Sequence, residues 1–280
     1  MAEPVNNTYG SVFAPSLPGT PAGPTSSRQI GAGAIVATVS GRCTLNGRVS
    51  VDSAQNFAGY HLNRPPSPGS ISLTVGSLAG TATITANGLT GNTGVSATDG
   101  YGPSGGGRIA IRLTDENAAF SAQDLVRITA RGVTQTTVNS CTNTSSAGTI
   151  YLETAAQSGK RGLIIVRNDN NAANMAYTPI PAAAEADSAE NFRSASLSVE
   201  AAARVKLFDD LRMVALDMAS DTALDLNGKT LVVNKATLGG VKLASGTYAA
   251  GDEEVSGFVV DSVTGGKLVV TGGGFSIIVR

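Results

Sequence analysis

The stretch GYGPSGGGRIAIRL, from Gly100 to Leu113, decides the fold expected for this chain, because its pattern is written three times. Its final part, GGRIAIRL, has counterparts in PGSISLTV at 68–75 and in AGTIYLET at 147–154. Alignment on the isoleucine that follows the glycine makes three residues equivalent, 38 and 41 positions apart: Ile71, Ile109 and Ile150. A unit that recurs about every 40 residues indicates supersecondary units stacked on one another.

A second recurring piece precedes each copy: RVSVDS at Arg48, TITANG at Thr83 and RITARG at Arg127. Alignment makes Val49, Ile84 and Ile128 equivalent. In both pieces apolar and polar residues alternate, which is typical of strands with one buried face. We therefore predict an all-β fold, a parallel β-helix (solenoid) with an irregular crossing segment and a C-terminal β cap. Its isoleucines should form a continuous apolar column.

The composition divides the chain into four parts. Residues 1–33, with five of the eleven prolines, are expected to form an extended arm or linker. Residues 34–167 hold the repeat solenoid, and residues 168–194 are expected to be an irregular crossing with one short helix around Ala183–Asn191. Residues 195–280 should form the C-terminal solenoid and cap, in which Asn227–Gly228 predicts a β-hairpin.

The overall composition limits the possible functions. Charged residues are 15% and aromatic residues 5% of the chain, against a usual charged share of about 25%. The formal charge of −1 and the pI near 5.9 give no electrostatic basis for binding nucleic acid. No run approaches 18 consecutive apolar residues, so we expect no membrane-spanning helix. Low charge with abundant Thr, Ser, Asn and Gly favours an extracellular or cell-surface protein, although MAEPVNNTYG has no features of a signal peptide.

The two cysteines, Cys43 and Cys141, leave two alternatives open. A disulfide between them would close a loop of about 98 residues and could stabilise the fold by about 4 kcal/mol. The two cysteines lie in different registers of the repeat, however, and free structural thiols are the simpler interpretation.

The succession ITANG, GYGPSGGGRIAIRL, ITARG, SSAGTIYLET and GLIIVRN resembles the Gly-rich repeats of large bacterial surface and autotransporter-like proteins. ALDLNGKTLVV followed by LGGVKLASGTY is similar to the C-terminal β-domains that end such chains. The resemblance covers residues 41–280. It implies a parallel β-helix displayed outside the cell with an adhesive or structural role, and it implies no catalytic residues.

Two possible sites lie in the glycine-rich and histidine-containing loops. Gly100, Gly102 and Gly105 match the dinucleotide fingerprint by letter, but that motif must open a helix, and here a strand follows. His61 is the only histidine, so neither a Ser-His-Asp triad nor a multi-histidine metal site can be built. We predict a glycine turn and an exposed histidine, and no cofactor.

Acidic and basic clusters are the remaining candidates. Asp209–Asp210 could serve polysaccharide cleavage by paired carboxylates, or could form a corner between two strands. The run 168–171, Asn-Asp-Asn-Asn, offers oxygen ligands for calcium but lacks the further carboxylates of a tight site, so turn formation is the simpler explanation. Lys160–Arg161 with Arg167 would form a small basic patch on a solvated loop. No catalytic, cofactor or metal residue is assigned.

The sequence favours a non-enzymatic scaffold, adhesin or assembly subunit. A carbohydrate-binding or polysaccharide-cleaving protein on the same fold is one alternative, with surface glycans as ligands. A phage-derived or intracellular structural protein is the other. Self-association is expected through the solenoid ends or the Pro-rich arm, since the apolar segment Phe275–Val279 needs cover.

Overall fold

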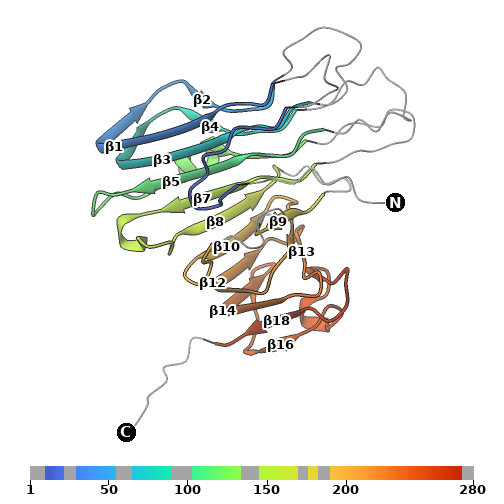
Figure 1. The fold of residues 1–280 in the computed structure, drawn as a ribbon. Coiled ribbons are helices and arrows are strands. Elements are labelled where there is room, and N and C mark those ends of the chain that lie inside the picture. The colour runs from blue at the N-terminus through green and yellow to red at the C-terminus, as the bar shows by residue number, and fades with distance from the viewer. Residues whose placement is uncertain are drawn as a thin grey trace, which may run out of the picture.

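The computed structural model describes residues 10–21, 30–54, 65–89, 103–133, 145–169, 176–181 and 190–272. Most of the described elements are strands in one 11-stranded sheet and two smaller sheets of four and three strands (Figure 1). The large sheet runs in the order β1-β3-β5-β7-β8-β10-β12-β14-β18-β16, with β15 paired to β14. Its two ends, β1 and β16, lie at opposite ends of the molecule (Figure 1).

The large sheet consists of two blocks of parallel strands. The first block contains β1 (Ala34–Leu45), β3 (Ser70–Gly80), β5 (Arg108–Leu113) and β7 (Thr149–Glu153). The second block contains β8 (Leu163–Arg167), β10 (Ser196–Glu200), β12 (Leu211–Met218), β14 (Thr230–Leu238) and β18 (Lys267–Val270). Two short antiparallel strands complete it, β15 (Val241–Lys242) and β16 (Gly246–Tyr248).

Each small sheet is parallel and packs against one block. The three-stranded sheet is formed by β2 (Arg48–Ser50), β4 (Thr83–Thr85) and β6 (Ile128–Thr129). The four-stranded sheet is formed by β9 (Thr178–Ile180), β11 (Arg204–Leu207), β13 (Ala223–Asp225) and β17 (Val259–Val260). The described helical elements are α1 (Ala122–Arg127) and the 3₁₀ turns η2 (Ala155–Gln157) and η4 (Glu253–Val255).

The predicted alignment of the recurring pieces is confirmed residue by residue. Ile71 pairs with Ile109, which pairs with Ile150. In the small sheet Val49 pairs with Ile84, which pairs with Ile128. The isoleucines of both columns are at most 2% exposed and belong to one core cluster.

The predicted parallel β-helix is wrong, because the large sheet is mixed. β7 and β8 pair antiparallel, with Leu152 opposite Leu163 and Ile150 opposite Ile165. Only the nine residues 154–162 join these strands, whereas a parallel connection needs about a dozen or more. Gly159 and Lys160 both take positive φ in this turn, and the chain direction reverses there. We call this antiparallel pair the seam.

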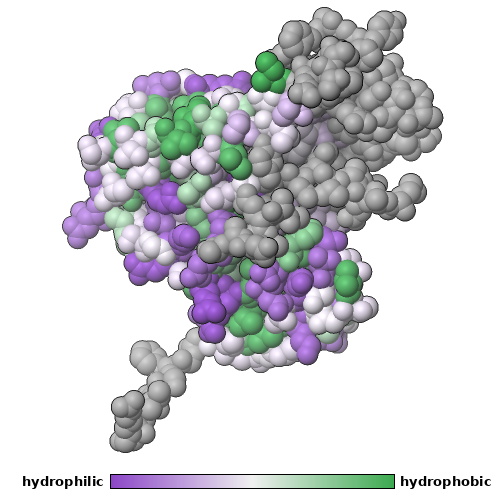
Figure 2. Space-filling view, in the orientation of Figure 1, coloured by the Kyte–Doolittle hydropathy of each residue, from purple (hydrophilic) through white to green (hydrophobic). Residues whose placement is uncertain are grey.

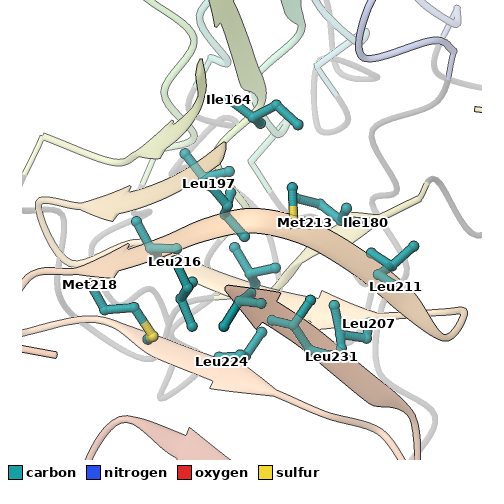
Figure 3. Packing of buried hydrophobic residues seen from close by; sticks show 14 of the residues in the cluster. Ile164, Ile180, Leu197, Leu207, Leu211, Met213, Leu216, Met218, Leu224 and Leu231 are labelled. Carbon is teal, nitrogen blue, oxygen red and sulfur yellow. The ribbon is translucent and has the colours of Figure 1, made fainter. Parts of the chain in front are cut away.

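The core lies between the large sheet and the small sheets. Beside the second block, side chains from its strands and from the four-stranded sheet converge on one cluster, whose members include Ile164, Ile180, Leu197, Met213 and Leu231 (Figure 3). A second cluster joins the first block to the three-stranded sheet. Most side chains in both clusters are aliphatic, in agreement with the composition, and three of the described aromatic residues contact one another at a site described below.

The N-terminal segment 10–21 lies across the outer face of the first block, and this corrects the prediction of half-exposed strands. All five residues of β7 are buried, and Arg108 on β5 is only 1% exposed. The segment is fixed to β3 by the Ser70 hydroxyl, which donates to the Leu17 carbonyl at 2.7 Å. It is fixed to β5 by Arg112, which donates to the Phe13 carbonyl. The outward-facing residues are therefore covered.

The predicted hairpin at Asn227–Gly228 is also wrong, although the turn is present. Both residues have positive φ, 51° and 73°, as a two-residue turn of this type requires. The strands that they join, β13 and β14, belong to different sheets, so the turn forms a corner. The tight hairpin of this region is instead β14–β15, closed by Gly239–Gly240 with Leu238 opposite Val241.

Two further elements differ from the expectation, α1 and β9. Helix α1 begins at a capping box in which Ser121 and Asp124 bond each other's backbone N–H groups. Strand β9 lies in the segment expected to be irregular, and the expected helix at 183–191 lies largely outside the described residues. In the described part of the chain, no helix has the length and apolar character needed to cross a membrane.

Candidate functional site

Three long inserts begin and end at neighbouring positions of the first block, and hydrogen bonds between their ends close each base. The Ser53 hydroxyl donates to the Pro66 carbonyl at 2.6 Å. Ser104 N donates to the Leu89 carbonyl at 3.0 Å, and Ser145 N donates to the Val133 carbonyl at 3.3 Å. The inserts between these residues fall largely outside the described residues, but their stems are ordered by strand-like contacts.

The three stems stack on one another in the order of the strands. Ser53 N donates to the Asn87 carbonyl, and Gly88 N donates to the Arg131 carbonyl, both at 2.9 Å. The Ser145 hydroxyl donates to the Ser104 carbonyl at 2.8 Å. We call residues 51–54, 65–69, 86–89, 103–107, 130–133 and 145–148 the stem row. It holds the ends of all three inserts in one line.

A ladder of Asp and Asn side chains reinforces the stem row. Asp52 accepts from Asn87 N at 2.6 Å, and the Asn87 amide oxygen accepts from Arg131 N at 3.0 Å. The Asn168 amide oxygen accepts from Gly132 N at 2.9 Å. Each side chain thus satisfies a backbone N–H of an adjacent layer, which is the role of Asp and Asn in turns rather than in catalysis.

Glycines allow the layers of the stem row to approach closely. A Cβ on Gly69 would lie 1.8 Å from the Gly33 carbonyl oxygen, and one on Gly148 would lie 1.8 Å from that of Gly107. A Cβ on Gly107 would lie 2.2 Å from the Gly69 carbonyl oxygen. These four residues form a column in which each glycine contacts the one before it. This column is the structural reason for the recurring glycine that first revealed the repeat.

The predicted acidic and glycine candidates have structural partners. Asp209 and Asp210 are exposed at the bend between β11 and β12, which confirms the corner interpretation. Asp209 accepts from Asp210 N at 2.8 Å, and Asp210 accepts from Thr230 N at 2.7 Å. Gly105 lies in the stem before β5, so its loop leads into a strand, as expected. Gly100, Gly102, His61 and Cys141 lie outside the described residues, and Cys43 is a free, half-buried thiol.

The predicted basic patch is not assembled as one surface. Lys160 Nζ lies 5.2 Å from the centre of the Phe13 ring, and Arg161 donates to the Ser158 carbonyl. Arg167 donates to the carbonyls of Leu125 and Ile128, and so links β8 to the α1–β6 segment. Asp169 pairs with Arg131 at 3.2 Å, while Asn170 and Asn171 lie outside the described residues.

An aromatic cluster at the seam was not foreseen from the sequence. Phe13 contacts Tyr151 edge-on at 4.9 Å and Phe192 at 5.1 Å between ring centres. Glu190 accepts hydrogen bonds from the Ser11 hydroxyl and from Val12 N. Tyr151 belongs to the first block, whereas Glu190 and Phe192 lead into β10 of the second. The N-terminal segment therefore bridges the two blocks.

Tyr151 is the most perturbed acid of this cluster. Its hydroxyl donates to Glu153 and accepts from Gly162 N at 3.2 Å. Burial, and next the hydrogen bond to Glu153, raise the pKa of Tyr151 well above its usual range. The phenol therefore stays protonated at neutral pH and acts as a fixed donor within the seam.

A second polar cluster closes the corner between β13 and β17. Lys206 Nζ lies 3.3 Å from Asp225 Oδ2, and Asp225 Oδ1 accepts from the backbone N–H groups of Ser262 and Asn227, both at 2.9 Å. Burial acts to raise the pKa of Asp225, but these hydrogen bonds and the Lys206 charge outweigh it, so the pKa is lowered. The carboxylate holds the corner together.

Among the described residues, no three His, Cys, Asp or Glu side chains lie close enough together to hold a metal ion. No protein-family model, no curated protein and no solved structure matches the chain.

Proposed function

We propose that this protein is a non-enzymatic scaffold displayed outside the cell, whose stem row holds three polar inserts in a line for adhesion to surface glycans. The stem row is the observation that carries the proposal. Its hydrogen bonds fix both ends of each insert, so the insert sequences can vary without altering the strands. Binding residues are commonly placed on loops that a rigid framework positions in this way.

The chemistry of the acidic side chains supports a structural role. Asp52, Asp210, Asp225 and Asp261 all accept hydrogen bonds from backbone N–H groups. A carboxylate used in this way stabilises a turn and is not free to protonate a glycosidic oxygen. The insert sequences, rich in Asn, Thr, Ser and Gly and including Tyr60 and Tyr101, supply the hydroxyl, amide and aromatic groups that sugars engage.

The test replaces the insert 90–102 by a four-residue Gly-Ser link between the described stem residues Leu89 and Pro103. We expect the melting temperature to change by only a few degrees, because the stem hydrogen bonds remain. Binding to a printed array of bacterial and host glycans should be lost or altered. The same replacement at 134–144 is the matched second variant.

Enzymatic activity is tested by incubating the protein with a panel of polysaccharides. Release of new reducing ends or unsaturated products by the intact chain would contradict a non-enzymatic role. Unfolding of both replacement variants would contradict the independence of stems and inserts. Glycan binding that both replacements leave unchanged would place adhesion elsewhere on the molecule.

A further inference from the structure

The β1–β2 end of the molecule is an unfinished layer of the core. Ile35 and Ala37 on β1 pair with Ile71 and Leu73 on β3, yet they are only half-buried, while Ile71 and Leu73 are at most 5% exposed. In the small sheet, Val49 is half-buried while its partner Ile84 is 2% exposed. Inner layers are covered from both sides, so the outermost layer lacks a neighbour.

The edge of β1 is long and carries little protection against pairing. The strand has twelve residues, and in the described part of the chain it pairs only with β3. Its first half, Ala34–Val39, is regular and uncharged, and an irregularity follows between Val39 and Arg42. Val36 is 64% exposed, and apolar surface lies over this end of the molecule (Figure 2). Natural edge strands usually carry Lys, Pro or a covering loop.

The N-terminal segment of the same chain does not cover this edge in its described part. Residues 10–21 are held on the outer face of the first block, where Val12 and Phe13 are at most 1% exposed under Glu190. Gly19 N donates to the Ala32 carbonyl at 2.7 Å, so the segment ends beside the start of β1 without running along it. The expected arm is therefore engaged with its own body over these residues.

The segment Phe275–Val279 has the sequence that the β1 edge requires. Phe275, Ile277 and Val279 alternate with Ser276 and Ile278, and the five residues carry no charge. These five residues are one fewer than the six of Ala34–Val39, and their period of two matches the half-buried Ile35 and Ala37. In the sequence, the four residues 271–274 stand between the end of β18 and this segment.

The segment cannot reach β1 of its own chain. β18 is the eighth strand on from β1 in the sheet, a distance of about 38 Å at ~4.8 Å per strand. Phe275 is five residues beyond Val270, the last residue of β18, and five extended residues span about 17 Å. Only a second copy can bring this segment to the edge.

We propose that Phe275–Val279 of one copy adds as a strand to β1 of a second copy, so that the protein assembles head to tail into open filaments. The proposal deepens the scaffold function, on which it rests. The edge and the segment are different surfaces, and β1 and β18, which the segment follows, are far apart in the sheet, so each added copy leaves one free edge and one free segment. Strand addition would also complete the half-buried layer at β1 and β2.

The test compares three full-length variants that each gain two lysines. Val36→Lys/Thr38→Lys blocks the β1 edge at exposed positions, and Ile277→Lys/Val279→Lys blocks the donor segment. Ala156→Lys/Ser158→Lys alters exposed residues near the seam, away from both ends, and is the matched control. Sedimentation velocity over a concentration series measures the mass of each variant and of mixtures.

The wild-type chain and the control should both exceed the monomer mass of 28.1 kDa increasingly as concentration rises. Each blocked variant should remain monomeric alone. An equimolar mixture of the two blocked variants should form a species of twice the monomer mass, because one supplies a free edge and the other a free segment. This complementation is specific to head-to-tail pairing.

Several results would overturn the proposal. A monomeric wild-type chain at every concentration would do so while leaving the glycan test of the scaffold function unaffected. Assembly of the segment-blocked variant alone would show that β1 edges pair with each other or that the contact lies elsewhere. A mixture that stays monomeric, or a segment-blocked variant with a clearly lowered melting temperature, would place the segment in its own chain.

Discussion

At the residue scale, the glycine before each strand of the first block is a packing requirement. The Gly33, Gly69, Gly107 and Gly148 column brings successive layers into contact through carbonyl oxygens, and no side chain fits between them. The position of this column is readable from the sequence, since glycine recurs immediately before the alternating strand. The reason for these glycines cannot be read from the sequence, because each contacts a carbonyl oxygen of another layer, far away in the sequence.

Replacing Gly107 by Ala should destabilise the protein by about 1–3 kcal/mol, because the new Cβ meets the Gly69 carbonyl and the backbone must shift. Gly33→Ala is the matched control, since Gly33 ends the column and has no atom within 4 Å of its added Cβ. Chemical unfolding of both variants measures the difference. Equal stabilities for the two variants would refute the close packing of the column.

Replacing Tyr151 by Phe should lower the free energy of unfolding at pH 7 by about 1–2 kcal/mol, because Gly162 N loses its acceptor and Glu153 loses one donor. The raised pKa of Tyr151 gives this loss a pH dependence. In the unfolded chain the phenol loses its proton near pH 10, while the folded protein retains it to higher pH. The stabilisation is therefore complete below pH 10 and falls as the pH rises further.

Unfolding curves between pH 7 and pH 11 compare Tyr151→Phe with the wild-type chain. The gap between the two free energies should be constant at neutral pH and should narrow above pH 10. If the difference in unfolding free energy widens above pH 10, the Tyr151 hydroxyl does not act as a protonated donor at the seam.

Residue patterns predicted the inward-facing side chains but not the outward-facing ones. Ile71, Ile109 and Ile150 alternate with polar neighbours, and this alternation located the core correctly. The same alternation implied exposure for Arg108 and Tyr151, which are buried. Tyr151 is covered by Phe13, which lies 138 positions earlier in the chain, and no local pattern contains that information.

At the element scale, the N-terminal segment 10–21 connects the two blocks in addition to the β7–β8 strand pair. Phe13 is 1% exposed and lies between Tyr151 and Phe192, one from each side of the seam. Replacing Phe13 by Ala should cost about 3–5 kcal/mol from lost burial and the remaining cavity. Leu17→Ala, in the same segment but 42% exposed, should cost much less.

Thermal unfolding followed by circular dichroism measures both variants. A loss for Phe13→Ala no larger than that for Leu17→Ala would show that the segment is only attached and does not contribute to the core. A single transition that separates into two in Phe13→Ala would further show that the segment couples the blocks.

Strand register was predictable, whereas strand direction was not. Register follows from matching apolar positions, which the aligned pieces preserve over three layers. Direction depends on the connection between β7 and β8, where the informative signal is the short turn containing Ser158, Gly159 and Lys160. Helix α1 had a signal as well, the Ser121–Asp124 capping box, but it is a single turn beside a strand that fits the repeat.

At the scale of the whole molecule, the two blocks of opposite direction explain why an expected single repeat architecture does not hold. The first block has the inserts with stacked stems, whereas the second has the larger core cluster. The candidate binding framework therefore belongs to the first block alone. The position of the seam follows from the turn geometry at Gly159 and Lys160.

The bridge formed by segment 10–21 has a consequence for synthesis on the ribosome. Ser11 and Glu190 hydrogen-bond across 179 positions of sequence, so the segment made first must wait for residues made much later. At roughly 5–20 residues per second the wait is about 9–36 s, during which Phe13 has no pocket. The strands of the first block can pair in that interval, but their outer face is not yet covered by segment 10–21. Segment 10–21, although it is synthesised before both blocks, is thus among the last parts of the described structure to reach its final position.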